Sequence, residues 1–242
     1  MAVVIWGDPD EPEPFPLDGI VEPPPPPPLH AAKMAIAQTA KKERIGRLLS
    51  IIPPVMAKLY FRYSAMNAGK STALIQVAHN YEENGRTVAL FTSAIDDRYG
   101  PGTITSRIGP RRTSKTYNES FDFFAAMTQM RDISCLLVDE AQFLTPNQVR
   151  QLHRGAHQLD IPVICYGIRS DFLGEPFPGS AYLLTLADSI EELKNICACG
   201  RKATMNPRFA DNVRVFAGDQ VAIEGRVEYK PMCARCFYEG QK

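Results

Sequence analysis

Apolar and polar positions alternate with two periodicities along this chain, one typical of strands and one typical of helices. Four strands are predicted, at residues 58–63, 86–92, 133–138 and 161–166. The last two are continuously apolar, as expected of central parallel strands that are covered on both faces. Apolar residues at helical spacing predict three helices, at residues 72–83, 121–130 and 146–159. The alternation predicts an α/β fold with an open parallel sheet, whose ligands bind at the carboxyl ends of the strands.

Local signals add detail to this outline. Thr145 is the expected N-cap of the last helix, with Pro146 at the first helical position. The polar stretch 93–118 is rich in Gly, Arg, Ser and Thr, and a loop of that length in a compact domain is usually a lid or a binding loop. Residues 213–229 alternate as a β-hairpin around Gly218-Asp219.

The first 55 residues have a different composition. Half of the 20 prolines lie at positions 9, 12, 14 and 16 and in the unbroken run 23–28. Proline lacks a backbone N–H and favours an extended form. Residues 1–55 are therefore predicted to be a disordered extension, with translation starting at Met56; a linker or a ligand for proline-binding domains is the alternative. Two domains are expected after it, at 56–192 and 193–242.

Charge and cysteine usage exclude several classes of protein. The chain has 27 basic and 27 acidic residues, which argues against a general nucleic-acid or membrane-surface binder. No apolar run reaches the length of a membrane span. No secretory signal is present, so the six cysteines are expected to be reduced. Cys135 and Cys165 lie inside apolar runs and are interpreted as buried, inert thiols.

The segment between the first predicted strand and helix matches the phosphate-binding loop G-x-x-x-x-G-K-[ST], with serine in place of the first glycine. Its residues are Ser64, Ala65, Met66, Asn67, Ala68, Gly69, Lys70 and Ser71. Gly69 lets backbone N–H groups turn toward the phosphates, Lys70 reaches the β/γ oxygens and Ser71 can ligate Mg²⁺. The helix N-terminus adds its positive dipole end. An ordinary strand–turn–helix corner is the alternative, but the flanking elements favour an ATP site.

Two carboxylates, Asp139 and Glu140, follow the strand 133–138. An acidic residue at the end of an apolar strand has the position of a carboxylate that holds Mg²⁺ in phosphate-loop enzymes. Asp139 would stay near the metal, while Glu140 could accept the proton of an attacking hydroxyl. The alternative is an acidic pair that only complements a helix dipole.

Four further cysteines form a C-x-C pair and a C-x-x-C pair separated by 33 residues, namely Cys197, Cys199, Cys233 and Cys236. Four thiolates can surround one tetrahedral Zn²⁺, so the spacing predicts a zinc ribbon. Free thiols or disulfides are the alternatives. Because cysteine fills all four positions, no coordination site stays open, and the predicted role of the ion is structural.

In this order, the three motifs resemble those of the thymidine kinases shared by bacteria and the animal cytosol, over residues 56–238. The segments that carry the resemblance are 63–72, 96–98, 106–109, 138–143, 165–172 and the four cysteines. The resemblance implies a P-loop NTPase-like (RecA-like) open sheet with a small C-terminal zinc-ribbon domain that carries a lasso loop. It also implies transfer of the ATP γ-phosphoryl group to the 5′-hydroxyl of thymidine, giving thymidine monophosphate.

The resemblance assigns roles around the phosphates. Glu140 matches the proton acceptor of the family, and Asp139 supports the contacts that Lys70 and Ser71 make with phosphate and Mg²⁺. Arg98 matches an arginine that approaches the transferring phosphates. The nucleotide-binding set also takes in two residues that follow the carboxylates, Ala141 and Gln142.

The resemblance also implies a nucleoside pocket. Met66, Phe143 and Phe172 match its apolar walls, Tyr229 a polar contact, and Asp96 lies near the substrate. Taken alone, these side chains are more typical of core packing. Because much base recognition in the family comes from main-chain groups, thymidine and deoxyuridine are both plausible substrates. Deoxycytidine is less so.

Members of this family are commonly cytoplasmic homotetramers that thymidine triphosphate inhibits, so the resemblance implies both properties here. An ATPase whose zinc ribbon binds nucleic acid is an alternative class, but the even charge balance argues against it. A non-catalytic nucleotide sensor is another, and Glu140 argues against that. His153 and His157 lie four positions apart on one predicted helix, a spacing that could bind a metal ion, but no acidic or cysteine partner accompanies them. Both are interpreted as solvated helix residues.

Overall fold

The computed structural model describes residues 56–96, 100–130, 132–221 and 227–240, which belong to one compact unit. The expectations for residues 1–55 and for Arg98 lie outside the described residues. The domain boundary expected after residue 192 stays a prediction. Within the described ranges, each helix is too short or too polar to span a bilayer.

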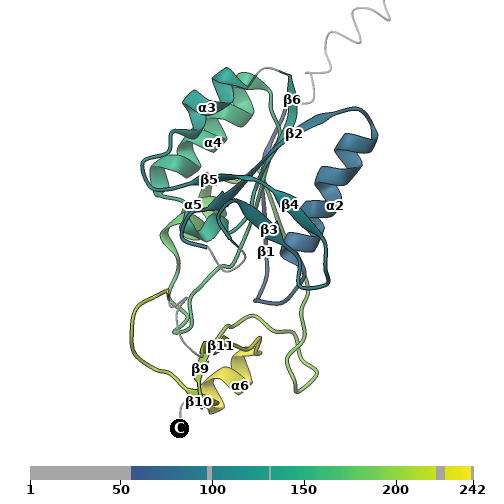
Figure 1. The fold of residues 1–242 in the computed structure, drawn as a ribbon. Helices are drawn as coiled ribbons and strands as arrows, with labels where there is room; N and C mark the ends of the chain where they lie inside the picture. The colour runs from purple at the N-terminus through teal and green to yellow at the C-terminus, as the bar shows by residue number, and fades with distance from the viewer. Residues whose placement is uncertain (1–55, 97–99, 131, 222–226, 241–242) are drawn as a thin grey trace, which may run out of the picture. The chain divides into compact units, whose positions relative to one another are not determined.

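A six-stranded parallel sheet forms the centre of the fold (Figure 1). Its strands in spatial order are β5 (Lys115–Tyr117), β2 (Thr87–Ser93), β6 (Ile133–Val138), β7 (Val163–Gly167), β1 (Leu59–Tyr63) and β8 (Ser189–Glu192). The two continuously apolar runs are the central strands β6 and β7. The predicted α/β fold with an open parallel sheet is therefore confirmed.

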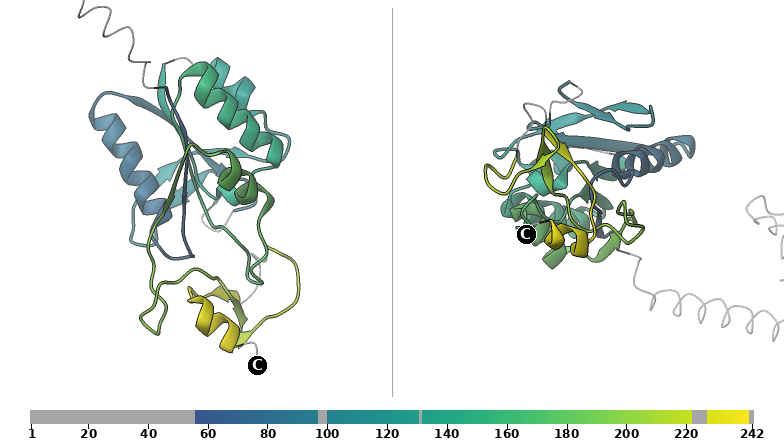
Figure 2. Two further views of the ribbon diagram at one scale, coloured as in Figure 1. Left: turned by 180° about the vertical axis from the view of Figure 1, so that it is seen from behind. Right: turned by 90° about the horizontal axis from the view of Figure 1, so that it is seen from below.

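Helices cover both faces of the sheet, with α2 (Lys70–Glu83) on one face. The other face carries α3 (Phe123–Gln129), α4 (Pro146–Leu159) and α5 (Pro178–Leu186), as Figures 1 and 2 show. Successive residues of β6 point to opposite faces, as strand geometry requires. Cys135 and Leu137 pack with α2, while Leu136 and Val138 pack with the other three helices. Two apolar cores thus hold the sheet between two helical layers.

The start of α4 agrees with its sequence signals. The Thr145 hydroxyl accepts a hydrogen bond from the Gln148 backbone N–H at 3.2 Å, and the Gln148 side chain accepts one from the Thr145 N–H at 3.0 Å. This reciprocal capping box satisfies two backbone donors that a helix start would otherwise leave unpaired. The predicted helix bounds, 146–159, are confirmed.

The prediction of one continuous loop over 93–118 is wrong in part. That stretch contains β3 (Thr103–Thr105) and β4 (Arg111–Thr113), which pair with each other, and β5, which joins the edge of the main sheet. Each strand has only three residues, too few for an alternating pattern to stand out. β5 is held by tertiary contacts, because its Tyr117 is buried in the core. The sequence pattern also left α5 and β8 unassigned.

The predicted hairpin around Gly218-Asp219 is also wrong. The strands β10 (Val213–Arg214) and β11 (Val227–Tyr229) both pair antiparallel with β9 (Arg208–Ala210) and not with each other. The tight turn lies instead at Asp211 and Asn212, whose φ angles are 47° and 65°. Two consecutive left-handed residues match the right-handed twist of a two-residue hairpin, which favours pairing of β10 with β9. A last helix, α6 (Ala234–Glu239), follows β11.

Candidate active site

The loop between β1 and α2 has the backbone geometry that its glycine predicts. Gly69 precedes the first helical residue with φ 79° and ψ 24°, a left-handed conformation that residues with a Cβ rarely adopt. The loop lines a cavity of about 150 Å³. The other walls are Glu140 and the segment 105–108. Backbone N–H groups at a helix N-terminus thus border a space that can hold phosphates.

The structure brings the two phosphate-site motifs together. Lys70 Nζ donates to Ser64 Oγ at 3.3 Å and to the Ala65 carbonyl at 3.2 Å, so the ammonium group lies over the loop. Ser71 Oγ donates to Asp139 Oδ2 at 2.9 Å, although the two residues are 68 positions apart. A hydroxyl and a carboxylate at this distance are oxygen ligands that suit Mg²⁺.

Asp139 lies at the end of β6 and is only 5% exposed. Burial raises the pKa of its carboxyl group to about 7, and the neighbouring Glu140 charge adds to the rise, while the bond from Ser71 opposes it. A cation close to Asp139 would relieve the cost of burying this negative charge.

This shift predicts how stability depends on pH in the absence of Mg²⁺ and nucleotide. The folded-state pKa of Asp139 lies above its ordinary value of 3.8, so the folded protein binds the proton more tightly than the unfolded chain. The contribution to stability is present at low pH and is lost as pH rises through about 7. Asp139→Asn should therefore be more stable relative to the wild type at about pH 8 than at about pH 5.5, which urea unfolding at both pH values would measure. If the difference in unfolding free energy between Asp139→Asn and the wild type did not change with pH, the raised pKa of Asp139 would be contradicted.

Glu140 has an unusual backbone, with φ 51° and ψ 41°. A non-glycine residue in the left-handed region costs roughly 1–3 kcal/mol and persists only where its surroundings hold it. Tyr117 Oη donates to the Glu140 carbonyl at 2.8 Å. Gln142 Nε2 donates to the Glu140 carboxylate at 2.5 Å and is itself held by the Ile168 N–H, which donates to Gln142 Oε1 at 3.2 Å. These bonds fix the carboxylate at the edge of the phosphate cavity.

A second cavity of about 240 Å³ adjoins the first. All five residues predicted for the nucleoside pocket line it, namely Met66, Asp96, Phe143, Phe172 and Tyr229. Gln142, predicted with the nucleotide, also lies on this wall. Met66 and Arg107 line both cavities, so the two spaces meet there. Apolar walls with a few polar groups are typical of a small-molecule site.

Arg208 supports the wall of the larger cavity, and the sequence did not indicate it. Its side chain is 4% exposed, and its guanidinium lies 3.8 Å from the centre of the Phe172 ring. It donates to Tyr229 Oη at 3.0 Å and to the Asp219 carbonyl at 2.6 Å. Arg208 also donates to the Gln220 carbonyl at 3.2 Å, so it joins three residues that line the larger cavity, Phe172, Gln220 and Tyr229. It belongs to no motif, so no local pattern could have singled it out.

Two asparagines connect the phosphate loop to the cysteine-bearing segment. The Asn206 side chain accepts from the Met66 N–H at 2.7 Å, and Asn195 Nδ2 donates to the Met66 carbonyl at 2.7 Å. Met66 is therefore held on both sides of its backbone. Neither asparagine was predicted, because their partner is more than 100 positions away in the sequence.

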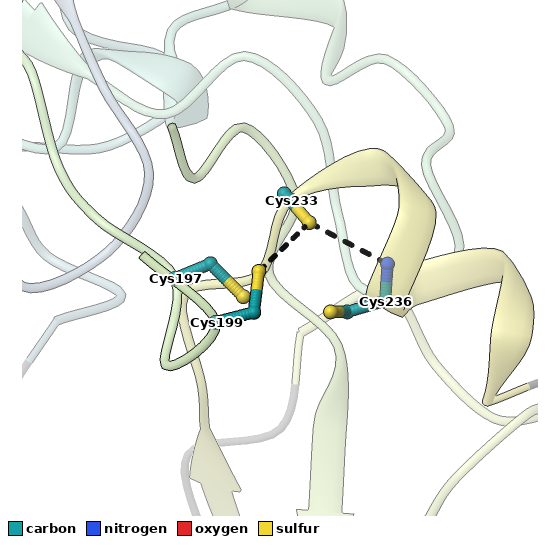
Figure 3. Close-up of side chains that lie close together, drawn as sticks. All are labelled: Cys197, Cys199, Cys233 and Cys236. Carbon is teal, nitrogen blue, oxygen red and sulfur yellow. Dashed lines mark hydrogen bonds between the residues drawn. The ribbon is translucent and has the colours of Figure 1, made fainter. Parts of the chain in front are cut away.

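The four predicted zinc ligands gather at one point (Figure 3). Their sulfur atoms all lie within 4.8 Å of one another, and Cys199 Sγ is 3.6 Å from Cys233 Sγ. Zn–S bonds of about 2.3 Å in a tetrahedral site would separate the sulfurs by about 3.8 Å, so the cluster fits this ion. Bonds to the Cys199 and Cys233 thiols raise the pKa of Cys236 to about 12. A cation is what would let four adjacent thiols ionise together.

Comparisons with known proteins agree with this geometry. A family model described as thymidine kinase matches residues 57–237. The thymidine kinase of Chromobacterium violaceum is 59% identical over 184 residues, which cover 76% of this chain and 99% of that protein. The thymidine kinases of Albidiferax ferrireducens and Aliivibrio fischeri are 55% and 50% identical, each over 76% of this chain and over 93% and 98% of their own lengths. The chain belongs to the thymidine kinase family.

Proposed function

We propose that the two adjoining cavities are the ATP and thymidine sites, with Glu140 as general base between them. As a thymidine kinase, the chain transfers a phosphoryl group from ATP to thymidine and produces thymidine monophosphate for nucleotide salvage. The observation that supports the proposal is the meeting of the cavities at Met66 and Arg107. Glu140 lines the phosphate cavity, and its carboxylate accepts a hydrogen bond from Gln142, which lines the larger cavity.

In the proposed mechanism, the 5′-hydroxyl of thymidine points toward Glu140. The carboxylate accepts the hydroxyl proton as the oxygen attacks the γ-phosphorus and the bond to the β-phosphate oxygen breaks. Lys70 and the N–H groups of the phosphate loop stabilise negative charge on the phosphates. Ser71 and Asp139 would hold Mg²⁺, which neutralises phosphate charge when it is bound. Arg98 and Arg107 are proposed as two further cations that stabilise negative charge on the phosphates.

The thymine base is proposed to lie in the cavity of about 240 Å³. Phe143 and Phe172 supply apolar walls that suit a flat pyrimidine, and Tyr229 supplies a polar contact. The same walls accommodate uracil, so deoxyuridine is proposed as a second substrate. Inhibition by thymidine triphosphate and a homotetrameric state are proposed from the family resemblance.

Phosphoryl transfer from γ-labelled ATP in the presence of Mg²⁺ tests the proposal. Thymidine, deoxyuridine, deoxycytidine and no acceptor would be compared at equal concentration. We expect strong labelling of thymidine, weaker labelling of deoxyuridine and little of deoxycytidine. Equal ATP hydrolysis with and without thymidine would overturn the assignment of the larger cavity to the nucleoside.

Arg208→Ala is expected to raise the KM for thymidine about 10–100-fold, because it removes a buried cation over an aromatic ring and three charge-assisted hydrogen bonds. The KM for ATP should change little, since the Arg208 partners Phe172, Gln220 and Tyr229 line the larger cavity and not the phosphate cavity. Arg208→Lys should not restore the wild-type value, because an ammonium group lacks the planar stacking surface. Steady-state kinetics in both substrates would measure these effects.

Lys230→Met is the matched control for Arg208. Like Arg208, Lys230 is a cation over an aromatic ring, 4.7 Å from the centre of Phe209. Phe209, unlike Phe172, does not line the nucleoside cavity. Loss of Lys230 should leave the KM for thymidine within about threefold of the wild type. Equal effects of the two substitutions would assign Arg208 a general role in folding.

A further inference from the structure

Two histidines on α4 meet a carboxylate that the sequence places far from them. His153 and His157 are one helical turn apart, and their ring centres are 4.5 Å apart. Asp188 follows the end of α5, and its Oδ2 lies 3.1 Å from His157 Nε2. One ligand atom from each residue lies within 4.8 Å of the others. The interpretation of both residues as histidines without an acidic partner is therefore wrong.

We propose that His153, His157 and Asp188 form a binding site for a divalent transition-metal ion, separate from the cysteine cluster. Two histidines at i and i+4 on one helical face present their nitrogens to the same point. Imidazole and carboxylate together suit ions such as Zn²⁺, Ni²⁺ and Cu²⁺. Bonds of about 2.0–2.2 Å in a tetrahedral site separate ligand atoms by about 3.3–3.6 Å. Small side-chain rotations would bring the three ligand atoms into that range.

The carboxylate of this site is held in place by backbone contacts. Asp188 Oδ2 accepts from the Leu59 N–H at 2.8 Å, and the Asp188 N–H donates to the Leu59 carbonyl at 2.9 Å. Asp188 is therefore fixed to the first residue of β1 by both its main chain and its side chain. A ligand oriented by a further hydrogen bond binds metal more strongly than a mobile one.

Exposure also suits an ion that enters from solvent. The side chains of His157 and Asp188 are 28% and 24% exposed, so water reaches them but does not surround them. By contrast, His79 and Glu83 on α2 form a pair at 3.2 Å whose side chains are 49% and 64% exposed. That pair offers one imidazole and one carboxylate from a single helix. It provides a matched control within the same chain.

An ion at this site would join α4 to the segment between α5 and β8. Because the unfolded chain does not bring these three residues together, the ion would bind the folded state preferentially and stabilise it. None of the three residues lines the two substrate cavities, so the proposal predicts stabilisation without a change in kcat.

The test uses the full chain with its cysteine site first loaded with one equivalent of Zn²⁺. Ni²⁺ is then titrated by isothermal calorimetry, and thermal unfolding is followed with and without Ni²⁺. We expect one Ni²⁺ per chain, with affinity reduced at least tenfold in His153→Gln and in Asp188→Asn and unchanged in His79→Gln. At about 100 times the Kd, Ni²⁺ should raise the Tm by about 5–10 °C in the wild type and much less in the two site variants.

Asp188→Asn keeps an acceptor for the Leu59 N–H, so the fold is retained while the anionic ligand is lost. Two results would overturn the proposal. One is a wild type that binds no more Ni²⁺ than His153→Gln, which would leave the His157–Asp188 contact as an ordinary hydrogen bond. The other is an equal loss of affinity in His79→Gln, which would indicate general binding by surface histidines.

Discussion

Glu140→Gln is expected to lower kcat for thymidine phosphorylation by about 10²–10⁴-fold, the range that a general base contributes. Glutamine keeps the size of the side chain and can still contact Gln142, but it cannot accept the proton of the 5′-hydroxyl. The KM values for thymidine and ATP should change little, because neither cavity loses a wall. Single-turnover transfer from γ-labelled ATP separates this chemical step from product release.

Two further variants make this prediction specific. Glu140→Gly should lose activity to a similar extent without loss of stability, because its φ of 51° suits glycine. Glu119→Gln changes an exposed carboxylate outside both cavities and should leave kcat within about threefold of the wild type. A Glu140→Gln enzyme with nearly normal kcat would show that the hydroxyl proton leaves by another route.

Cys233→Ser is expected to remove bound zinc and, with it, most thymidine phosphorylation. A structural zinc site of this kind has an apparent binding free energy of about 10–16 kcal/mol in small zinc domains at pH 7, comparable to the whole stability of a typical protein. The stretch between the cysteine pairs carries Asn206, Arg208 and Tyr229, which support or line the proposed nucleoside cavity. Loss of the zinc ion should therefore raise the KM for thymidine more than the KM for ATP.

Zinc content, kinetics and limited proteolysis would measure these effects together. We expect about one Zn²⁺ per chain in the wild type, far less in Cys233→Ser, and new cleavage between residues 193 and 240. Cys135→Ala serves as control, because Cys135 is buried against α2 and away from the cluster; its zinc content should match that of the wild type. Full activity in a zinc-free Cys233→Ser protein would show that the metal does not organise the nucleoside site.

The elements that could be predicted are those whose signals are local. β6 and β7 are continuously apolar because helices cover both faces of the sheet, and α4 carries its own capping box at Thr145. The phosphate loop needs a left-handed residue before its helix, and Gly69 supplies it. In each case, adjacent residues carry the whole signal, so neighbouring positions are enough to read it.

The elements that were missed depend on partners far along the chain. β5 is three residues long and is stabilised by the burial of Tyr117 in the core. The turn at Asp211 and Asn212 pairs β10 with β9, and it was less evident than Gly218-Asp219. β11 pairs with the other edge of β9, about 17 positions along the chain. Short strands without a strong pattern of their own take their place from these contacts.

The chemically active residues of this protein lie in short sequence motifs. Their arrangement in space depends on contacts between residues that are far apart in the sequence. A phosphate loop, a carboxylate pair and four cysteines each require particular residue types at short spacing, so the sequence alone specified them. The contact of Asn206 with Met66 spans 140 positions, and those of Arg208 and of His157 with Asp188 also join separate elements. The hydrophobic pattern of the sequence does not reveal such pairs, because their residues are far apart along the chain and meet only in the folded structure.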